Sequence, residues 1–221
     1  FDEKNIYVAF HAYDSRPSGI LARETKRGTR FTGYDDFVAF AIDPFHTHQF
    51  RDRAFFIINP IGTQFAHLMG DRAVKLEWEG KWQAAAKIVA DGWTGEMAIP
   101  WAILNYPAKR GAVTAGINMD RLQQRTKIHS LWCNYGPQEL NELEGHWIGV
   151  QFPPYRPTLS LLPYTSIGWQ EGRGESFRSG VDARYTPTPT LTLVGTLNPD
   201  FQNVEEAVEG IDFSYGPRFV P

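Results

Sequence analysis

Short runs in which apolar and polar side chains alternate dominate residues 1–152. Alternation with a period of two is typical of a strand that buries one face, and residues 5–13 show it clearly. Residues 37–42 and 54–58 are apolar on both faces, as in a central strand of a two-layer structure. Further strands are expected at 113–119, 130–135 and 146–152. This pattern predicts an all-β fold, an antiparallel jelly-roll-like β-sandwich.

Turn chemistry separates these runs. Asp91-Gly92 is the clearest hairpin signal, because a tight turn needs the positive φ values that these residues tolerate. We expect its arms at 82–89 and 93–99. Residues 99–104 then predict one helical turn, since Pro100 is tolerated in the first turn of a helix.

Pro153-Pro154-Tyr155-Arg156-Pro157 is the best boundary in the chain, because consecutive prolines favour an extended linker. Residues 1–152 are therefore predicted to form the sandwich, with 153–157 as linker. Residues 158–221 form a strand-rich extension, with strands expected at 159–162, 181–185 and 191–197. Because two strands are marginal alone, these strands need partners upstream or in a C-terminal part beyond this chain.

Composition narrows the function classes. The chain has 221 residues, 42% of them hydrophobic, so it can bury a core. A net charge of −3 gives no basic face for nucleic acid. Cys133 is the single cysteine, which excludes an intrachain disulfide. The first residues lack the pattern of a signal peptide, although a leader cleaved from an exported protein is compatible with this start.

Two segments carry a family resemblance. Residues 91–101, with 7–10 and 40–43 before them, resemble family 9 carbohydrate-binding modules. Residues 180–221 resemble the junction, in a group of bacterial envelope proteins, between such a module and an outer-membrane β-barrel region. The resemblance implies a jelly-roll sandwich that binds sugar ends between tryptophan rings and holds structural calcium. It also implies export to the periplasm or outer membrane, and a chain that stops before its barrel.

Sugar binding needs flat aromatic faces against the C–H faces of a pyranose, with polar groups nearby. Trp78 and Trp82 flank a predicted turn, where exposed rings are expected, and Trp132 is the third candidate. Trp93 and Trp101 lie in the family-like segment and are interpreted as scaffold. For any one tryptophan, packing in the core or rim is the competing interpretation.

Carboxylates at strand ends are the candidate calcium ligands, because calcium takes six to eight oxygen atoms. Asp14, Asp35, Asp36 and Asp43 occupy such positions, although they cannot all serve one ion. The competing interpretation is that these residues form turns and solvate sheet edges.

Other metal and haem chemistry is less favoured by the sequence. His46-Thr47-His48 offers two imidazoles, but a solvated loop is the preferred interpretation. Met69, Met97 and His67 are the haem-ligand candidates, and without an attachment motif this redox alternative is remote. Met97 alternates with apolar positions and is expected in the core.

Enzyme chemistry is not supported. Glycoside cleavage uses two carboxylates across a cleft, and Glu139, Glu142 and Glu144 are the obvious ones. Their setting, 138–145, is interpreted as a solvated loop. The leading hypothesis is a non-catalytic module that presents a glycan or glycoconjugate to its own C-terminal barrel. The alternative is a structural plug or docking domain of an outer-membrane barrel without sugar binding. The oligomeric state is not indicated.

Overall fold

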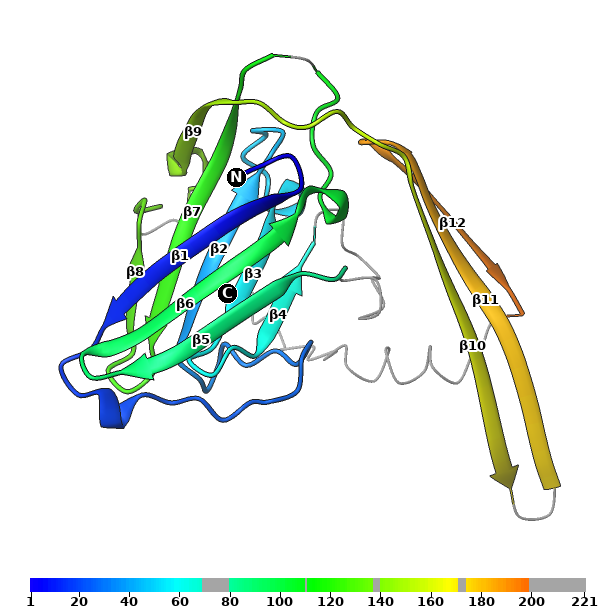
Figure 1. Ribbon diagram of the computed structural model, residues 1–221, viewed down its shortest axis with the longest axis horizontal. Coiled ribbons are helices and arrows are strands. Elements are labelled where there is room, and N and C mark those ends of the chain that lie inside the picture. The colour runs from blue at the N-terminus through cyan, green and yellow to red at the C-terminus, as the bar shows by residue number, and fades with distance from the viewer. Residues whose placement is uncertain (69–79, 110, 137–139, 171–173, 199–221) are drawn as a thin grey trace, which may run out of the picture. The chain divides into compact units, whose positions relative to one another are not determined.

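A computed structural model describes residues 1–68, 80–109, 111–136, 140–170 and 174–198. The chain divides into two compact units, Phe1–Arg156 and Pro157–Pro221. The described part of each unit consists of antiparallel strands joined by turns and loops (Figure 1).

The smaller sheet of the first unit has the order β1-β6-β5, with β1 at Asn5–Tyr13, β6 at Gly92–Pro100 and β5 at Gln83–Val89. Strands β5 and β6 form a hairpin in which Val89 pairs with Gly92. Ala90 and Asp91 therefore occupy the turn, one position earlier than Asp91-Gly92 predicts. The hairpin and its two arms are confirmed.

The larger sheet has the order β4-β3-β2-β7-β8, and β9 also pairs with β7. Because β2 occupies one edge of β7 along residues 116–122, β8 and β9 lie end to end along its other edge. In chain order the strands are β2 (Phe37–Asp43), β3 (Ala54–Ile58), β4 (Gln64–His67), β7 (Val113–Gln123), β8 (Ile128–Leu131) and β9 (Gly145–Val150).

The main core lies between the two sheets. Ile6, Val8, Trp93 and Ile99 from the smaller sheet belong to the same buried cluster as Phe40 and its neighbours from the larger one. A second cluster, Phe31, Phe37, Ala39 and Ile57, covers the opposite face of the larger sheet. Every residue of β2 is consequently buried. This two-sided burial explains why residues 37–42 are apolar on both faces, and it confirms their central position.

Short 3₁₀ turns interrupt the loops at Pro17–Gly19 (η1), Phe50–Asp52 (η2), Trp101–Ile103 (η4) and Asn141–Leu143 (η5). The helical turn expected after Pro100 is η4, with Pro100 as its N-cap. None of the helices in the described part of the chain has the length and apolar character needed to cross a bilayer.

The second unit contains the sheet β10-β11-β12, with β10 at Thr158–Gln170, β11 at Gly174–Thr188 and β12 at Leu191–Leu197. Leu159 pairs with Tyr185, and Tyr185 pairs with Leu193, so one face of the sheet is apolar. The adjacent row, Ser160, Arg184 and Val194, is mainly polar and faces the opposite side. The predicted fold class, an all-β sandwich with a strand-rich extension, is confirmed.

Candidate functional site

The outer face of the smaller sheet carries a groove built from alternate residues of its three strands. Because Ile6, Val8 and Ala12 face the core, the intervening residues of β1 face outward. Strand register sets two of the outward rows, which are Tyr7–Ala98–Gln83 and Ala9–Glu96–Ala85.

Small side chains make this face hollow. Ala9, Ala85 and Ala98 project only a methyl group each, whereas Tyr7 and Glu96 extend well beyond them. One depression of about 770 Å³ is lined by these five residues, among others. A second, of about 540 Å³, adjoins it and shares Ala9, Ala85 and Glu96 with the first. The two form a continuous groove along the sheet, comparable in volume with ligand sites of known proteins.

The aromatic wall of the groove is held in place by hydrogen bonds. Tyr7 is 54% exposed. Its hydroxyl group donates to Asp2 Oδ2 over 2.9 Å and accepts a hydrogen bond from Asn5 Nδ2 over 3.1 Å. Because both partners come from its own strand or the residues before it, the ring is oriented before any ligand arrives. A pre-oriented ring loses less conformational entropy on binding.

Polar side chains lie around the alanine floor. Gln64 and Gln83 line the end with Tyr7, and Gln64 Nε2 donates to the Trp82 carbonyl oxygen over 3.2 Å. Lys87 and Thr94 line the other end. Glu96 lies between them and is flanked by alanine on both neighbouring strands. The groove therefore combines an aromatic face and methyl groups with hydrogen-bonding groups of both kinds.

The three predicted tryptophans of the sugar site have different surroundings. Trp82 is only 3% exposed and packs edge-on against Phe56, with ring centroids 5.2 Å apart. Its ring fills the core beside the groove, so the expectation of an exposed ring at Trp82 is wrong. Trp132 is 58% exposed, but it follows β8 at the edge of the larger sheet. Trp78 lies outside the described residues.

The tryptophans interpreted as scaffold are indeed buried. Trp93 is 0% and Trp101 is 2% exposed. Met97, expected in the core, is buried as well. Trp101 Nε1 donates to the carbonyl oxygen of Asp2, which ties η4 to the start of β1.

The four predicted calcium ligands are buried, and N–H groups occupy much of their oxygen surface. Asp35 accepts hydrogen bonds from the backbone N–H groups of Arg23 and Glu24. Asp14 forms an ion pair with Arg125 at 2.8 Å. Among the residues that the structure describes, the four aspartates do not gather as three close ligand atoms. Their visible role is to fix loops to the sheets.

Asp36 and Asp43 each keep one buried carboxylate oxygen that has no hydrogen-bond partner among the described residues. Asp36 Oδ1 accepts from the backbone N–H of Gln124, and burial raises the pKa of this carboxyl group. Asp43 Oδ2 accepts from the backbone N–H of His48 over 2.8 Å. Of the predicted aspartates, Asp43 is thus the one that stands beside further ligand-type side chains.

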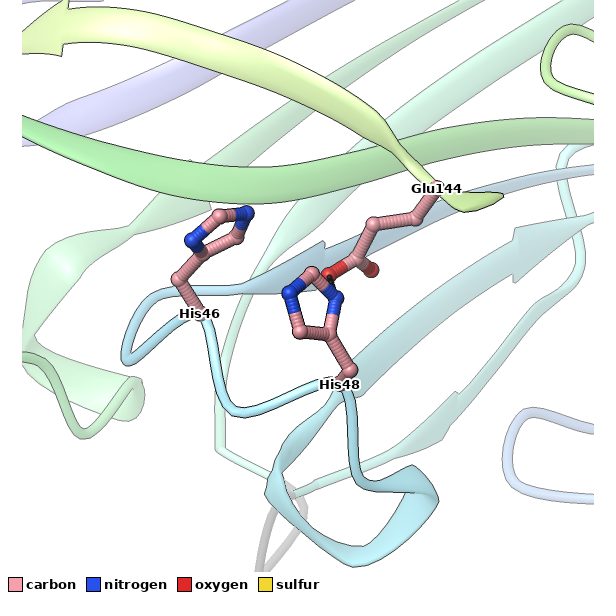
Figure 2. Close-up of side chains that lie close together, drawn as sticks. All are labelled: His46, His48 and Glu144. Carbon is pink, nitrogen blue, oxygen red and sulfur yellow. Dashed lines mark ion pairs between the residues drawn. The ribbon is translucent and has the colours of Figure 1, made fainter. Parts of the chain in front are cut away.

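Those side chains are His46, His48 and Glu144, which point toward one another in Figure 2. Their ligand atoms lie within 4.8 Å of one another, and His48 Nδ1 is 3.0 Å from Glu144 Oε1. The sequence favours a solvated loop for all three, and that expectation is wrong for Glu144, which is 5% exposed. These residues could hold a metal ion.

The groove could not be predicted from the sequence, because each of its residues is of a common type in strands. The alternation in residues 5–13 shows that Tyr7 and Ala9 face away from the core. Their meeting with Glu96 and Ala85, however, depends on the register of three strands. A run of small outward residues opposite one tyrosine is the signal that could have found it.

Comparisons with known proteins give no family assignment. No family model and no curated protein matches this chain. It is similar in structure to a family 9 carbohydrate-binding module from Caldicellulosiruptor kristjanssonii in complex with glucose, with 14% identity, coverage of 71% of this chain and 74% of that chain, and a TM-score of 0.46. It is also similar to a family 9 module from the same organism in complex with cellotriose. The identity is 14%, the coverage is 71% of this chain and 73% of that chain, and the TM-score is 0.44. At this level the likeness assigns no residue and no ligand to this chain.

Proposed function

We propose that the first unit is a non-catalytic carbohydrate-binding module, and that its ligand lies along the groove on the outer face of β1, β6 and β5. The observation that carries the proposal is the combination of a fixed, exposed tyrosine ring with a methyl floor and a polar border. Sugars present C–H faces and hydroxyl groups together, so they match a surface of this kind.

Each part of the groove would contact a different feature of the sugar. The Tyr7 ring stacks on the C–H face of one sugar ring, and the alanine methyl groups let the chain of sugars lie close to the sheet. The Gln83 amide donates or accepts hydrogen bonds at the hydroxyl groups, and the Glu96 carboxylate accepts them. The length formed by the two joined depressions suits an oligosaccharide better than a single sugar. The sequence resemblance to family 9 modules leads to the same expectation.

The chemistry of the groove favours binding over cleavage. Hydrolysis of a glycosidic bond generally uses two carboxylates, about 5 to 9.5 Å apart. Among the described residues that line the groove, Glu96 is the one that carries a carboxylate. A lone carboxylate in an open groove is suited to accepting hydroxyl hydrogen bonds.

The test is isothermal titration calorimetry of the full 221-residue chain against mono- and oligosaccharides, including glucose and cellotriose. Ala85→Arg places a long side chain in the part of the groove that both depressions share. Because Ala85 is exposed, this change leaves the core intact. We expect it to weaken binding at least about 30-fold, since it displaces the ligand from the floor.

The matched control is Ala102→Arg, which adds the same side chain at an exposed position of η4 outside the groove lining. It should bind as the unchanged protein does. Equal affinity of Ala85→Arg and the unchanged protein would place any sugar site elsewhere, and no binding across the panel would contradict the proposal itself. Repeating the titration with calcium and then EDTA tests whether calcium supports binding, as the aspartates Asp14, Asp35, Asp36 and Asp43 predict.

We further propose that the second unit belongs to an outer-membrane barrel region, which would place the module in the bacterial envelope. The support is its apolar face, on which Leu159, Leu161, Ile167 and Phe177 are all at least 61% exposed. Strands that alternate apolar and polar side chains in this way suit a lipid-facing surface. Reconstitution of the chain with outer-membrane lipids, compared with a chain carrying Leu161→Asp, tests this placement.

A further inference from the structure

We propose that His46, His48 and Glu144 form a binding site for a divalent transition-metal ion of the zinc type. The site lies on the face of the larger sheet that looks away from the smaller sheet, because Ile42 enters the main core and Asp43 points to the opposite side. It is therefore separate from the groove and independent of carbohydrate binding.

Strand register assembles the site. Asp43 at the end of β2 pairs with Gly116 of β7, which in turn pairs with His146 of β9. Gly116 has no side chain, and the Glu144 carboxylate fills the space above it. A Cβ atom at this position would lie only 2.0 Å from Glu144 Oε1. A glycine in the middle of the row thus makes room for the ligand set.

The loop after β2 holds both histidines in an uncommon conformation. His46 has φ 54° and His48 has φ 60°, in the left-handed region that non-glycine residues seldom occupy. The backbone N–H of His46 donates to the Asp43 carbonyl oxygen over 3.2 Å, and that of His48 donates to Asp43 Oδ2 over 2.8 Å. This backbone turns the two imidazoles toward each other, with ring centroids 4.4 Å apart.

The distances suit a single ion. Zinc binds imidazole nitrogen at about 2.0–2.1 Å and carboxylate oxygen at about 2.0–2.2 Å, which places tetrahedral ligand atoms roughly 3.3 Å apart. His48 Nδ1 and Glu144 Oε1 are already 3.0 Å apart. All three ligand atoms lie within 4.8 Å, so side-chain rotation alone brings His46 into range. The His146 ring packs edge-on against His46, with centroids 4.8 Å apart.

Charge also favours a bound cation. Asp43 and Glu144 are buried carboxylates, and the buried Arg53 guanidinium forms an ion pair with Glu144. This leaves one negative charge without compensation, which is costly away from water. Asp43 Oδ1 and His46 Nε2 are buried without a hydrogen-bond partner in the described part of the chain. A divalent ion between neutral imidazoles would compensate that charge.

Neighbouring groups prepare the ligands for metal. Arg53 holds Glu144 Oε2 at 2.5 Å, which leaves Oε1 directed at His48. Such contacts behind the ligands fix their orientation and raise metal affinity. Two imidazoles and one carboxylate match zinc-type ions better than calcium, which takes six to eight oxygen atoms.

The test is calorimetry of the metal-free, full-length chain with zinc chloride, and the probe is the zinc ion alone. We expect one ion per chain, and a loss of affinity of at least about 30-fold in His46→Asn and in His48→Asn. Asparagine tolerates positive φ, so these variants keep the loop conformation. The matched control, His11→Gln, removes an exposed histidine of β1 and should not change the affinity.

Cobalt substitution gives a second readout that does not depend on the stability of any variant. A site with two imidazoles and a carboxylate should give the intense visible bands of four-coordinate cobalt, and added zinc should abolish them. Three results would overturn the proposal: no zinc binding, unchanged binding in both asparagine variants, or calcium binding as tight as zinc binding. In any of these cases His48 and Glu144 form only an ion pair that fastens the loop.

Discussion

Arg53 should be among the most sensitive positions in the first unit. It comes directly before β3 and is 2% exposed. Its guanidinium donates to Asn141 Oδ1 at 2.7 Å and to the Asn141 carbonyl oxygen at 3.0 Å, to Tyr135 at 3.2 Å, and to Glu144 Oε2 at 2.5 Å. This one side chain fastens the loop that joins β8 to β9 onto the larger sheet.

The loss of stability expected in Arg53→Met depends on the groups that lose Arg53 as a partner. Glu144 would remain buried with its strongest partner gone, and Asn141 would lose two hydrogen bonds. Breaking a buried ion pair by removing one partner costs about 3–5 kcal/mol. Arg53→Met/Glu144→Gln removes both partners of this ion pair, so the double variant should recover at least about 1 kcal/mol relative to the sum of the single changes.

Urea unfolding followed by tryptophan fluorescence measures these differences, because the buried Trp93 reports on the sandwich core. EDTA is present throughout, so that bound metal adds nothing to the free energy of unfolding. The matched control is Arg51→Met, whose side chain is 70% exposed and should change stability by less than about 0.5 kcal/mol. If Arg53→Met costs no more than this control, the assignment of Arg53 as the fastening residue is refuted.

Two further predictions concern the smaller sheet and its connections. Burial raises the pKa of Asp14, but a backbone N–H, the Gln123 amide and the charge of Arg125 outweigh it and hold the pKa below 3.8. The free energy of unfolding of the unchanged protein should therefore exceed that of Asp14→Asn by its full amount at about pH 6. The difference should shrink as the pH falls below 3.8, and a difference in urea unfolding that does not depend on pH would contradict this prediction. Gly92→Ala should lower the free energy of unfolding by about 2 kcal/mol or more, because its Cβ atom would lie 2.1 Å from the Ala12 carbonyl oxygen, and an unchanged melting temperature would count against the β1–β6 register.

The strands could be predicted from the sequence because burial on one or both faces leaves a local signature. Residues 37–42 illustrate this, since a run that is apolar on both faces occurs where clusters cover both sides of a sheet. The observed turn, Ala90-Asp91, lies one position before the predicted turn, Asp91-Gly92. Asp91-Gly92 tolerates positive φ, but the pairing of Val89 with Gly92 determines which residues form the loop.

The functional residues were harder to predict because they depend on contacts between distant strands. Trp82 adjoins a predicted turn, a position that favours exposure. Its ring is nevertheless buried in the core, where it packs against Phe56. Glu144 lies in a polar stretch that predicts a solvated loop. The structure buries it instead, because it pairs with Arg53, which lies 91 positions earlier in the chain. His46 and His48 converge through left-handed backbone conformations, which a strand or loop pattern does not reveal.

Chemical-shift mapping would show whether a sugar contacts the groove. The full chain, with its alanine methyl groups labelled, is titrated with the tightest-binding oligosaccharide. We expect saturable shifts at the methyl groups of Ala9, Ala85 and Ala98, and no shift at the control methyl group of Ala102. Binding that leaves those three methyl groups unchanged, or that shifts only signals around Trp132, would contradict it.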